Sequence, residues 1–135
     1  MTCIRLSVDD ITALHSKLIF RSGGLDGIRD HHLLDLSVNS PYHTFDGQHL
    51  YPTLQAMAAH LAFSLVKNHP FLDGNKRIGI FAMMVFLKIN GHSLTCTDNE
   101  LETLGWGLAD GSITETDLLD WIIVHKARVD GQGKN

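Results

Sequence analysis

The chain of 135 residues has few of the residues that build disulfide or metal frameworks. It contains only two cysteines, Cys3 and Cys96, which form no CxxC pair, and its nine histidines include no HExxH or Cys/His spacing. A disulfide scaffold and a structural zinc site are therefore not expected. We interpret both thiols as reduced and non-catalytic, as in a cytoplasmic protein.

Basic charge and long apolar runs are also scarce. Charged residues make up 19% of the chain and the net charge is −4, whereas a protein that binds nucleic acid normally carries a basic face. No basic-plus-apolar signal segment opens the sequence, and the longest apolar stretches, interrupted by His60, Lys67 or Lys88, are too short to span a bilayer. We expect no direct nucleic-acid partner, no membrane partner and a cytoplasmic location.

What the sequence does contain is helical periodicity. Its length and its 44% hydrophobic fraction predict one globular domain at residues 1–129, followed by a polar, Gly-rich, disordered tail at 130–135. Capping residues precede segments with apolar residues at helical spacing. The predicted fold class is all-α, with helices at about 7–21, 30–39, 53–68, 75–90, 97–109 and 114–128. Trp106 and Trp121 are predicted to anchor the last two helices by packing.

The segment at residues 40–52 departs from this pattern. It shows no helical periodicity, has Pro41 and Pro52 near its ends, and contains Asp46-Gly47. These features predict a loop or a short β-hairpin between the second and third helices.

Nine consecutive residues between the two most apolar helices carry the chemistry: His69-Pro70-Phe71-Leu72-Asp73-Gly74-Asn75-Lys76-Arg77. Pro70 disfavours helix at the residue before it, so the preceding helix should end at His69. Gly74 tolerates backbone angles that other residues resist. A helix that starts at Gly74-Asn75 would present free N–H groups and its positive dipole end to an anion.

Each polar side chain in this stretch has a matching role in phosphate chemistry. His69 is a natural general base, because an imidazole titrates near neutral pH. Asp73 is a hard oxygen ligand of the kind that Mg²⁺ prefers, while Lys76 and Arg77 can neutralise phosphate oxygens. Taken singly, each residue is more often a helix end or a solvated turn; taken together, they indicate a phosphate-handling site.

The stretch resembles the signature of the Fic family, H-x-F-x-(D/E)-G-N-(G/K)-R. With Lys76 in the eighth place, and Ile80 where a second arginine would stand, it is similar to the death-on-curing (Doc) branch. The resemblance extends over roughly residues 5–126 and includes Gly27-Ile28-Arg29-Asp30, Leu50-Tyr51-Pro52-Thr53-Leu54 and Asn90-Gly91-His92. It implies a Fic-like helical bundle with a small β-hairpin flap.

The resemblance also implies an activity. Doc-like toxins use ATP and Mg²⁺ to transfer the γ-phosphate to a hydroxyl side chain of a translation factor, elongation factor Tu, and so arrest translation. His69 would be the catalytic base, Asp73 the metal ligand, and Gly74, Asn75, Lys76 and Arg77 would bind the nucleotide phosphates. Most Fic proteins instead transfer AMP, and Gly74 agrees with that pattern, so AMP transfer to a protein hydroxyl is the first alternative.

Two further alternatives stay open, a non-catalytic Fic-like binding module and a nucleotide hydrolase or de-AMPylating enzyme. The resemblance also implies a small antitoxin that inhibits in trans, because no (S/T)xxxE(G/N) inhibitory helix accompanies the motif. In Fic proteins an extended flap beside the active site holds the target by strand addition. Phe45, Asp46, Gly47 and Gln48 occupy the matching region, either as this target-docking flap or as an ordinary loop.

Overall fold

The computed structural model describes residues 3–127. Within this range it contains six α-helices: α1 (Val8–Ser22), α2 (His31–Asn39), α3 (Leu54–Asn68), α4 (Asn75–Ile89), α5 (Asp98–Asp110) and α6 (Glu115–Val124). A 3-10 helix, η1 (Ser40–Tyr42), and two strands, β1 (Thr44–Phe45) and β2 (Gln48–His49), connect α2 to α3. The predicted all-α class with a small hairpin is confirmed. The predicted disordered tail at 130–135 lies outside the described residues.

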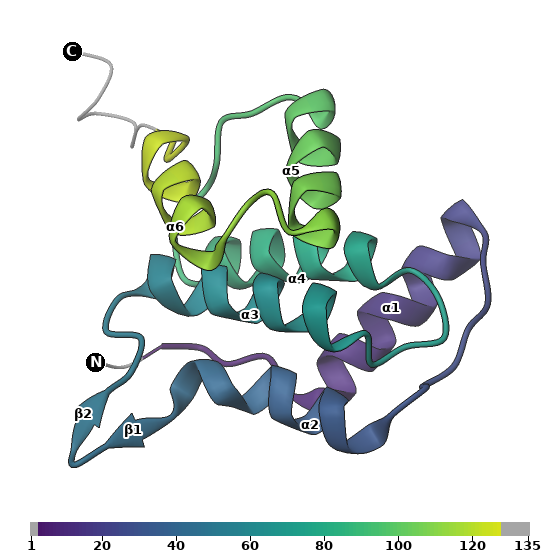
Figure 1. Ribbon diagram of the computed structural model, residues 1–135, viewed down its shortest axis with the longest axis horizontal. Helices are drawn as coiled ribbons and strands as arrows, with labels where there is room; N and C mark the ends of the chain where they lie inside the picture. Colours follow the sequence, from purple (N-terminus) through teal and green to yellow (C-terminus); the bar gives the residue numbers. More distant parts are fainter. Residues whose placement is uncertain (1–2, 128–135) are drawn as a thin grey trace.

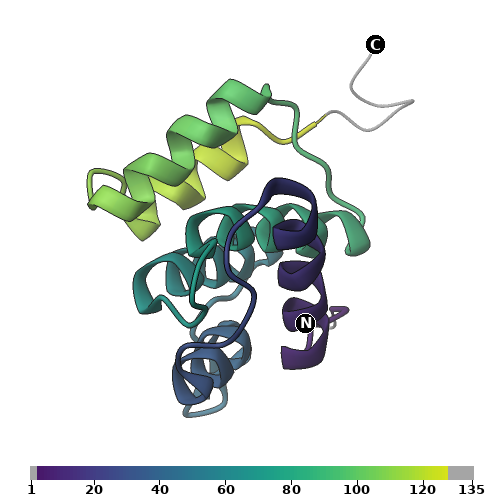
Figure 2. The ribbon, with the colours of Figure 1, turned by 90° about the vertical axis from the view of Figure 1, so that its right-hand side faces the viewer.

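The helices form three levels around a central pair. In Figure 1, α3 and α4 run across the middle, α5 and α6 lie above them, α2 lies below, and α1 runs obliquely past their right-hand ends. The turned view in Figure 2 keeps the α5–α6 pair above α3 and α4 and α2 below them, with α1 standing alongside the central pair. The central pair therefore has helices on both sides, as its nearly continuous apolar sequence predicts.

The helix starts follow local rules. Ser7 with Asp10, Thr97 with Glu100 and Thr114 with Asp117 each form a complete capping box, and the Thr53 side chain accepts a hydrogen bond from the Ala56 amide. Each cap satisfies backbone N–H groups that the first turn of a helix leaves without a partner. The predicted starts of α1, α3, α5 and α6 are therefore confirmed to within one residue.

One contact between α3 and α4 has room only for a glycine. A Cβ atom at Gly79 would lie 2.6 Å from Cγ2 of Val66 and 3.0 Å from the Ala62 carbonyl oxygen. Large apolar side chains of both helices, such as Met57 on α3 and Met83 on α4, are fully buried. Such dense packing gives the loop between the two helices fixed ends.

Two details differ from the sequence predictions. Helix α6 ends at Val124 rather than near residue 128, because the chain then leaves the helix and pairs with residues 93–95; the Thr95 amide donates to the His125 carbonyl and the Ala127 amide to the Ser93 carbonyl. Trp106 does not pack into the core: 58% of it is exposed. No helix in the described chain is both long and apolar enough to cross a membrane.

Candidate active site

The predicted phosphate-handling stretch forms the connection between α3 and α4, which we call the motif loop (residues 69–74). Helix α3 ends at His69, whose φ of 54° and ψ of 52° place it in the left-handed region. Gly74 precedes α4 with a φ of 76°, which glycine adopts without steric cost. Both predicted turning points are confirmed, and the His69 side chain is exposed.

An extended segment from the α1–α2 connection, residues 24–30, lies along the motif loop. Ile28 pairs with Phe71 in an antiparallel bridge, the Leu72 amide donates to the Gly27 carbonyl, and the Arg29 and Asp30 amides both donate to the Pro70 carbonyl. The Arg29 guanidinium donates to the carbonyls of Asn68 and His69 at 3.0 and 2.6 Å. It thereby occupies carbonyls that the end of α3 leaves without helical partners.

The centre of the motif loop is clamped by buried side chains. The Asn75 side chain is almost fully buried; its Oδ1 accepts from the Phe71 amide at 2.9 Å and its Nδ2 donates to the Phe71 carbonyl at 3.0 Å. Phe71 is fully buried and stacks on the His15 ring of α1, with ring centroids 3.8 Å apart. The Asn75 side chain is therefore committed to the loop, which leaves its backbone amide for a ligand.

Asp73 lies at the edge of the site with a half-exposed carboxylate. Its Oδ1 accepts from the Gly74 amide at 2.8 Å and its Oδ2 from the Leu25 amide at 3.2 Å. These hydrogen bonds, the one from Leu25 first, hold the pKa of Asp73 below its usual value. The chain passes so close that a Cβ atom at Gly24 would lie 2.7 Å from Oδ2. The carboxylate is thus ionised, oriented and still reachable, which suits a Mg²⁺ ligand.

The start of α4 supplies donors for an anion. No side chain caps this helix, and its first helical hydrogen bond runs from the Ile78 amide to the Gly74 carbonyl. The amides of Asn75, Lys76 and Arg77 have no acceptor in the described part of the chain. Three free N–H groups beside Asp73 and His69 are the arrangement that binds phosphate at a helix N-terminus.

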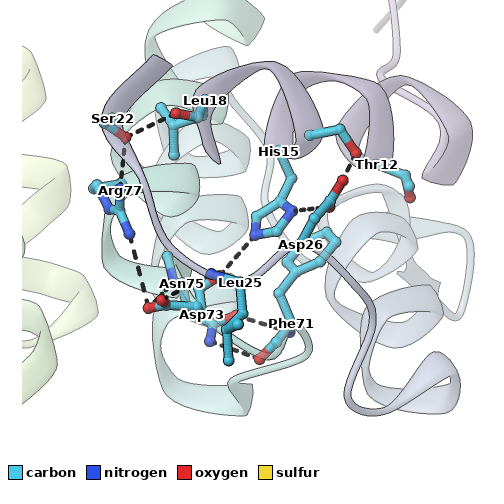
Figure 3. Close-up of polar contacts among 12 residues, drawn as sticks. Thr12, His15, Leu18, Ser22, Leu25, Asp26, Phe71, Asp73, Asn75 and Arg77 are labelled. Carbon is cyan, nitrogen blue, oxygen red and sulfur yellow. Dashed lines mark hydrogen bonds and ion pairs between the residues drawn. The ribbon is translucent and has the colours of Figure 1, made fainter. Parts of the chain in front are cut away.

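The two cations of the stretch point in different directions. The Nη1 of Arg77 donates to Ser22 Oγ at 2.6 Å and to the Gly23 carbonyl at 2.9 Å, and its Nη2 lies 3.7 Å from Asp73 Oδ1. Figure 3 shows Arg77 between the end of α1 and Asp73. The Lys76 Nζ instead lies over the Trp106 ring of α5, 3.4 Å from its centroid. Arg77 therefore borders the site, whereas the Lys76 ammonium is held on the α5 side.

The predicted flap residues are not brought to this site. Thr44 pairs with His49 and Phe45 with Gln48, and the turn at Asp46 and Gly47 has positive φ at both positions. This hairpin lies at the N-terminal end of α3, whereas the motif loop follows its C-terminal end (Figure 1). A helix of 15 residues separates them, about 22 Å at 1.5 Å per residue. Phe45, Asp46, Gly47 and Gln48 therefore form the predicted hairpin but do not lie beside the motif loop; the extended segment that does is 24–30.

Two residues of the site were missed by the sequence reasoning. Arg29 stands out in the sequence only as part of the Gly27-Ile28-Arg29-Asp30 run, and nothing local shows that its guanidinium reaches the end of α3. His15 had a signal, since it lies four residues from both Ile11 and Ile19 and therefore falls on the buried stripe of α1. A polar residue on such a stripe needs a buried partner, but the sequence does not show which.

A groove of about 500 Å³ adjoins the start of α4, between α1, α4 and α5. Its walls are mostly apolar and include Leu18, Ile80, Phe81 and Met84, while Lys76 and Arg77 border it. The groove continues from the N-terminal end of α4 along the helix.

Comparison with known proteins agrees with the resemblance that the motif residues suggest. Residues 5–87 match the Fic/DOC family. The chain is 46% identical over 72 residues to Toxin Doc of Mycolicibacterium smegmatis, a match that covers 53% of this chain and 55% of that protein. It is 27% identical over 115 residues to Protein kinase doc of Escherichia phage P1, which covers 85% of this chain and 90% of that protein. The chain thus spans about half of the first relative and most of the second.

Proposed function

We propose that this chain, which belongs to the Fic/DOC family, is a toxin that acts as an ATP- and Mg²⁺-dependent protein kinase. The observation that carries the proposal is the grouping of His69, the Asp73 carboxylate and three free amides of α4 around one loop. The name of the phage relative, Protein kinase doc, supports the same reaction class. A protein catalyses phosphoryl transfer mainly by positioning the reactants and stabilising charge, and the groups of this loop are suited to both tasks.

In the proposed reaction a hydroxyl oxygen of the target attacks the γ-phosphorus of ATP. The bond from that phosphorus to the β–γ bridging oxygen breaks, ADP leaves, and His69 takes the hydroxyl proton. The amides of α4 and the Arg77 guanidinium hold phosphate oxygens. Mg²⁺, held by Asp73 together with the phosphates, would neutralise charge on the nucleotide.

The direction in which ATP lies decides between kinase and AMP-transfer activity. Ile80 stands where AMP-transferring Fic proteins carry a second arginine, and here it lines an apolar groove, so it offers no clamp for a terminal phosphate. This favours phosphate transfer. One observation favours AMP transfer as the second candidate: the Lys76 ammonium lies over Trp106 and is held on the α5 side.

The proposed partners are a target in translation, elongation factor Tu, and a small antitoxin that inhibits in trans. The name Toxin Doc of the mycobacterial relative supports a toxin–antitoxin pair. The groove between α1, α4 and α5 is the surface that we expect the antitoxin to cover, because it joins the proposed phosphate site and exposes apolar side chains. Both partners and the enzyme are proposed to be cytoplasmic.

A labelling experiment tests the proposal. The chain is incubated with Mg²⁺, elongation factor Tu and ATP that is radiolabelled either at the γ- or at the α-phosphate. Label from γ-labelled ATP alone supports the kinase, because the α-phosphate leaves with ADP, and label from α-labelled ATP alone supports AMP transfer, because the γ-phosphate leaves with pyrophosphate. His69→Ala is the matched control, and label that is independent of His69 contradicts either transfer at this site. No label from either form, with the antitoxin absent and the target verified as native, overturns the proposed function.

A further inference from the structure

The residue with the clearest unexplained placement is His15, on the face of α1 that looks at the motif loop (Figure 3). It is fully buried, and burial of an imidazole is costly unless its nitrogens find partners. Its contacts are made with residues 58 and 56 positions away, Asp73 and Phe71. Neither contact is required for residues 8–22 to form the helix α1.

The first contact fixes one peptide group. Nε2 of His15 lies 2.7 Å from the Asp73 carbonyl oxygen, and a carbonyl can only accept, so Nε2 carries the hydrogen and donates. This carbonyl belongs to the peptide that links Asp73 to Gly74, directly before α4. A Cβ atom at Gly74 would lie 3.5 Å from the same nitrogen. His15 therefore holds the point at which the chain turns into the phosphate-binding helix end.

The second contact fixes the middle of the loop. The rings of His15 and Phe71 stack with an angle of 6° between their planes. Phe71 is also the residue whose amide and carbonyl are bound by Asn75. The imidazole thus reaches the loop at two places, one on each side of Leu72, while its Nδ1 lies 3.5 Å from Asp26 Oδ1 and makes no hydrogen bond in the described chain.

Only one hydrogen bond ties the Asp73 carboxylate to the 24–30 segment, the 3.2 Å contact from the Leu25 amide. The carbonyl contact from His15 is shorter and comes from a rigid helix. We propose that His15 is a positioning residue for the transfer reaction: it orients the Asp73–Gly74 peptide, and through it the Asp73 carboxylate and the first amides of α4. This inference rests on the proposed function of the motif loop.

Three substitutions of His15 separate the effect of its Nε2 donor from the effect of its stacked ring. His15→Gln keeps an amide donor near the position of Nε2, His15→Met has similar length without a donor, and His15→Phe keeps a ring for stacking on Phe71 without a donor. Ile11→Val, at a buried position one turn earlier on α1, is the control for a general loss of packing. Circular dichroism confirms that each variant is folded before it is used.

The first readout is the rate of transfer, separated into kcat and KM. Misplacement of a reacting group by about 1 Å can cost roughly a hundredfold in rate, so we expect His15→Met and His15→Phe to lower kcat by about ten- to a hundredfold. KM for the protein target should stay within a factor of about two, because His15 does not lie at the surface where a target binds. His15→Gln should recover most of the lost kcat, and Ile11→Val should leave it unchanged.

The second readout does not depend on activity. Amide hydrogen exchange by nuclear magnetic resonance should become faster at Phe71, Leu72 and Gly74 in His15→Met, while amides in the middle of α3 keep their protection. Unchanged exchange in the motif loop overturns the inference, as does full kcat in His15→Met. If the wild type transfers neither phosphate nor AMP, the proposed function fails, and the exchange result alone decides whether His15 positions the loop.

Discussion

The Nζ atom of Lys76 lies 3.4 Å from the centroid of the Trp106 ring, so the eighth residue of the motif points at α5. The contact needs Gly105, because a Cβ atom there would lie 2.9 Å from Cγ of Lys76. Gly105 and Trp106 together thus keep the lysine along the wall of the groove. A cation over the face of an aromatic ring is a favourable interaction. Trp106 can therefore stabilise the fold although it does not pack into the core.

Trp106→Ala should therefore destabilise the fold although Trp106 is mostly exposed. We expect a loss of about 0.5–1 kcal/mol in the free energy of unfolding, the usual range for a cation over an exposed ring. Trp106→Phe should retain part of it, since a phenyl face still attracts a cation. Urea unfolding measures both variants, and equal stability of the wild type and Trp106→Ala would contradict the role of this contact.

Replacement of the proposed base should abolish transfer and leave the fold intact. The His69 side chain is exposed, so His69→Ala removes no buried packing. Because His69 has a φ of 54°, His69→Asn is the better matched variant, as asparagine tolerates the left-handed region. We expect both to lose transfer and growth arrest with an unchanged circular dichroism spectrum. A folded variant that remains fully toxic would exclude His69 as the base.

The proposed metal ligand can be tested by binding. Asp73→Ala should lose the Mg²⁺-dependent part of the affinity for ATP, since no other carboxylate belongs to the motif. Isothermal titration calorimetry with and without Mg²⁺ measures that difference. The same affinity for Mg²⁺-ATP in Asp73→Ala and in the wild type would remove Asp73 from the metal site.

Asp73 should also contribute to acid stability. The Leu25 and Gly74 amides lower its pKa from the usual 3.8 in the folded chain, so the ionised form stabilises the fold. This contribution is complete above the unfolded value, and it is lost as the pH falls through the lower folded value. The free energy of unfolding should therefore fall less steeply below about pH 4 in Asp73→Asn than in the wild type. If the free energy of unfolding depended on pH in the same way in both proteins, the two amides would not favour the ionised carboxylate over its protonated form.

Two residues of the motif region differ from those of AMP-transferring Fic proteins, and we expect them to decide which group is transferred. Lys76→Gly combined with Ile80→Arg should weaken phosphate transfer and allow AMP transfer to be detected, because the arginine could hold the terminal phosphate in the opposite orientation. Ile80 lines the groove about one turn into α4. The α- and γ-labelled forms of ATP distinguish the products, and each single variant serves as a control. A double variant with the wild-type product pattern would contradict this role for the two positions.

Much of the helical architecture follows from local sequence. Ser7, Thr53, Thr97 and Thr114 each bind an amide within the next three residues, so no distant contact is needed to place a helix start. Pro70 and Gly74 also act locally. Pro70 ends α3 at the residue before it, and Gly74 makes the turn after which α4 begins. The candidate motif residues could be identified from their order; the structure places Asp73 and Arg77 side by side at the motif loop, whereas the Lys76 ammonium lies on Trp106.

The tertiary structure alone decided where the side chains of the site point. His15 reaches Asp73 across 58 residues, Arg29 reaches His69 across 40, and Lys76 reaches a tryptophan on another helix. It also placed the hairpin of residues 44–49 at the far end of α3 and segment 24–30 beside the motif loop. Local hydrogen bonds and periodicity act within about one helical turn, whereas these contacts depend on how the helices pack. For that reason the sequence by itself determined most of the elements and the candidate residues of the site, and only the packed fold determined their partners.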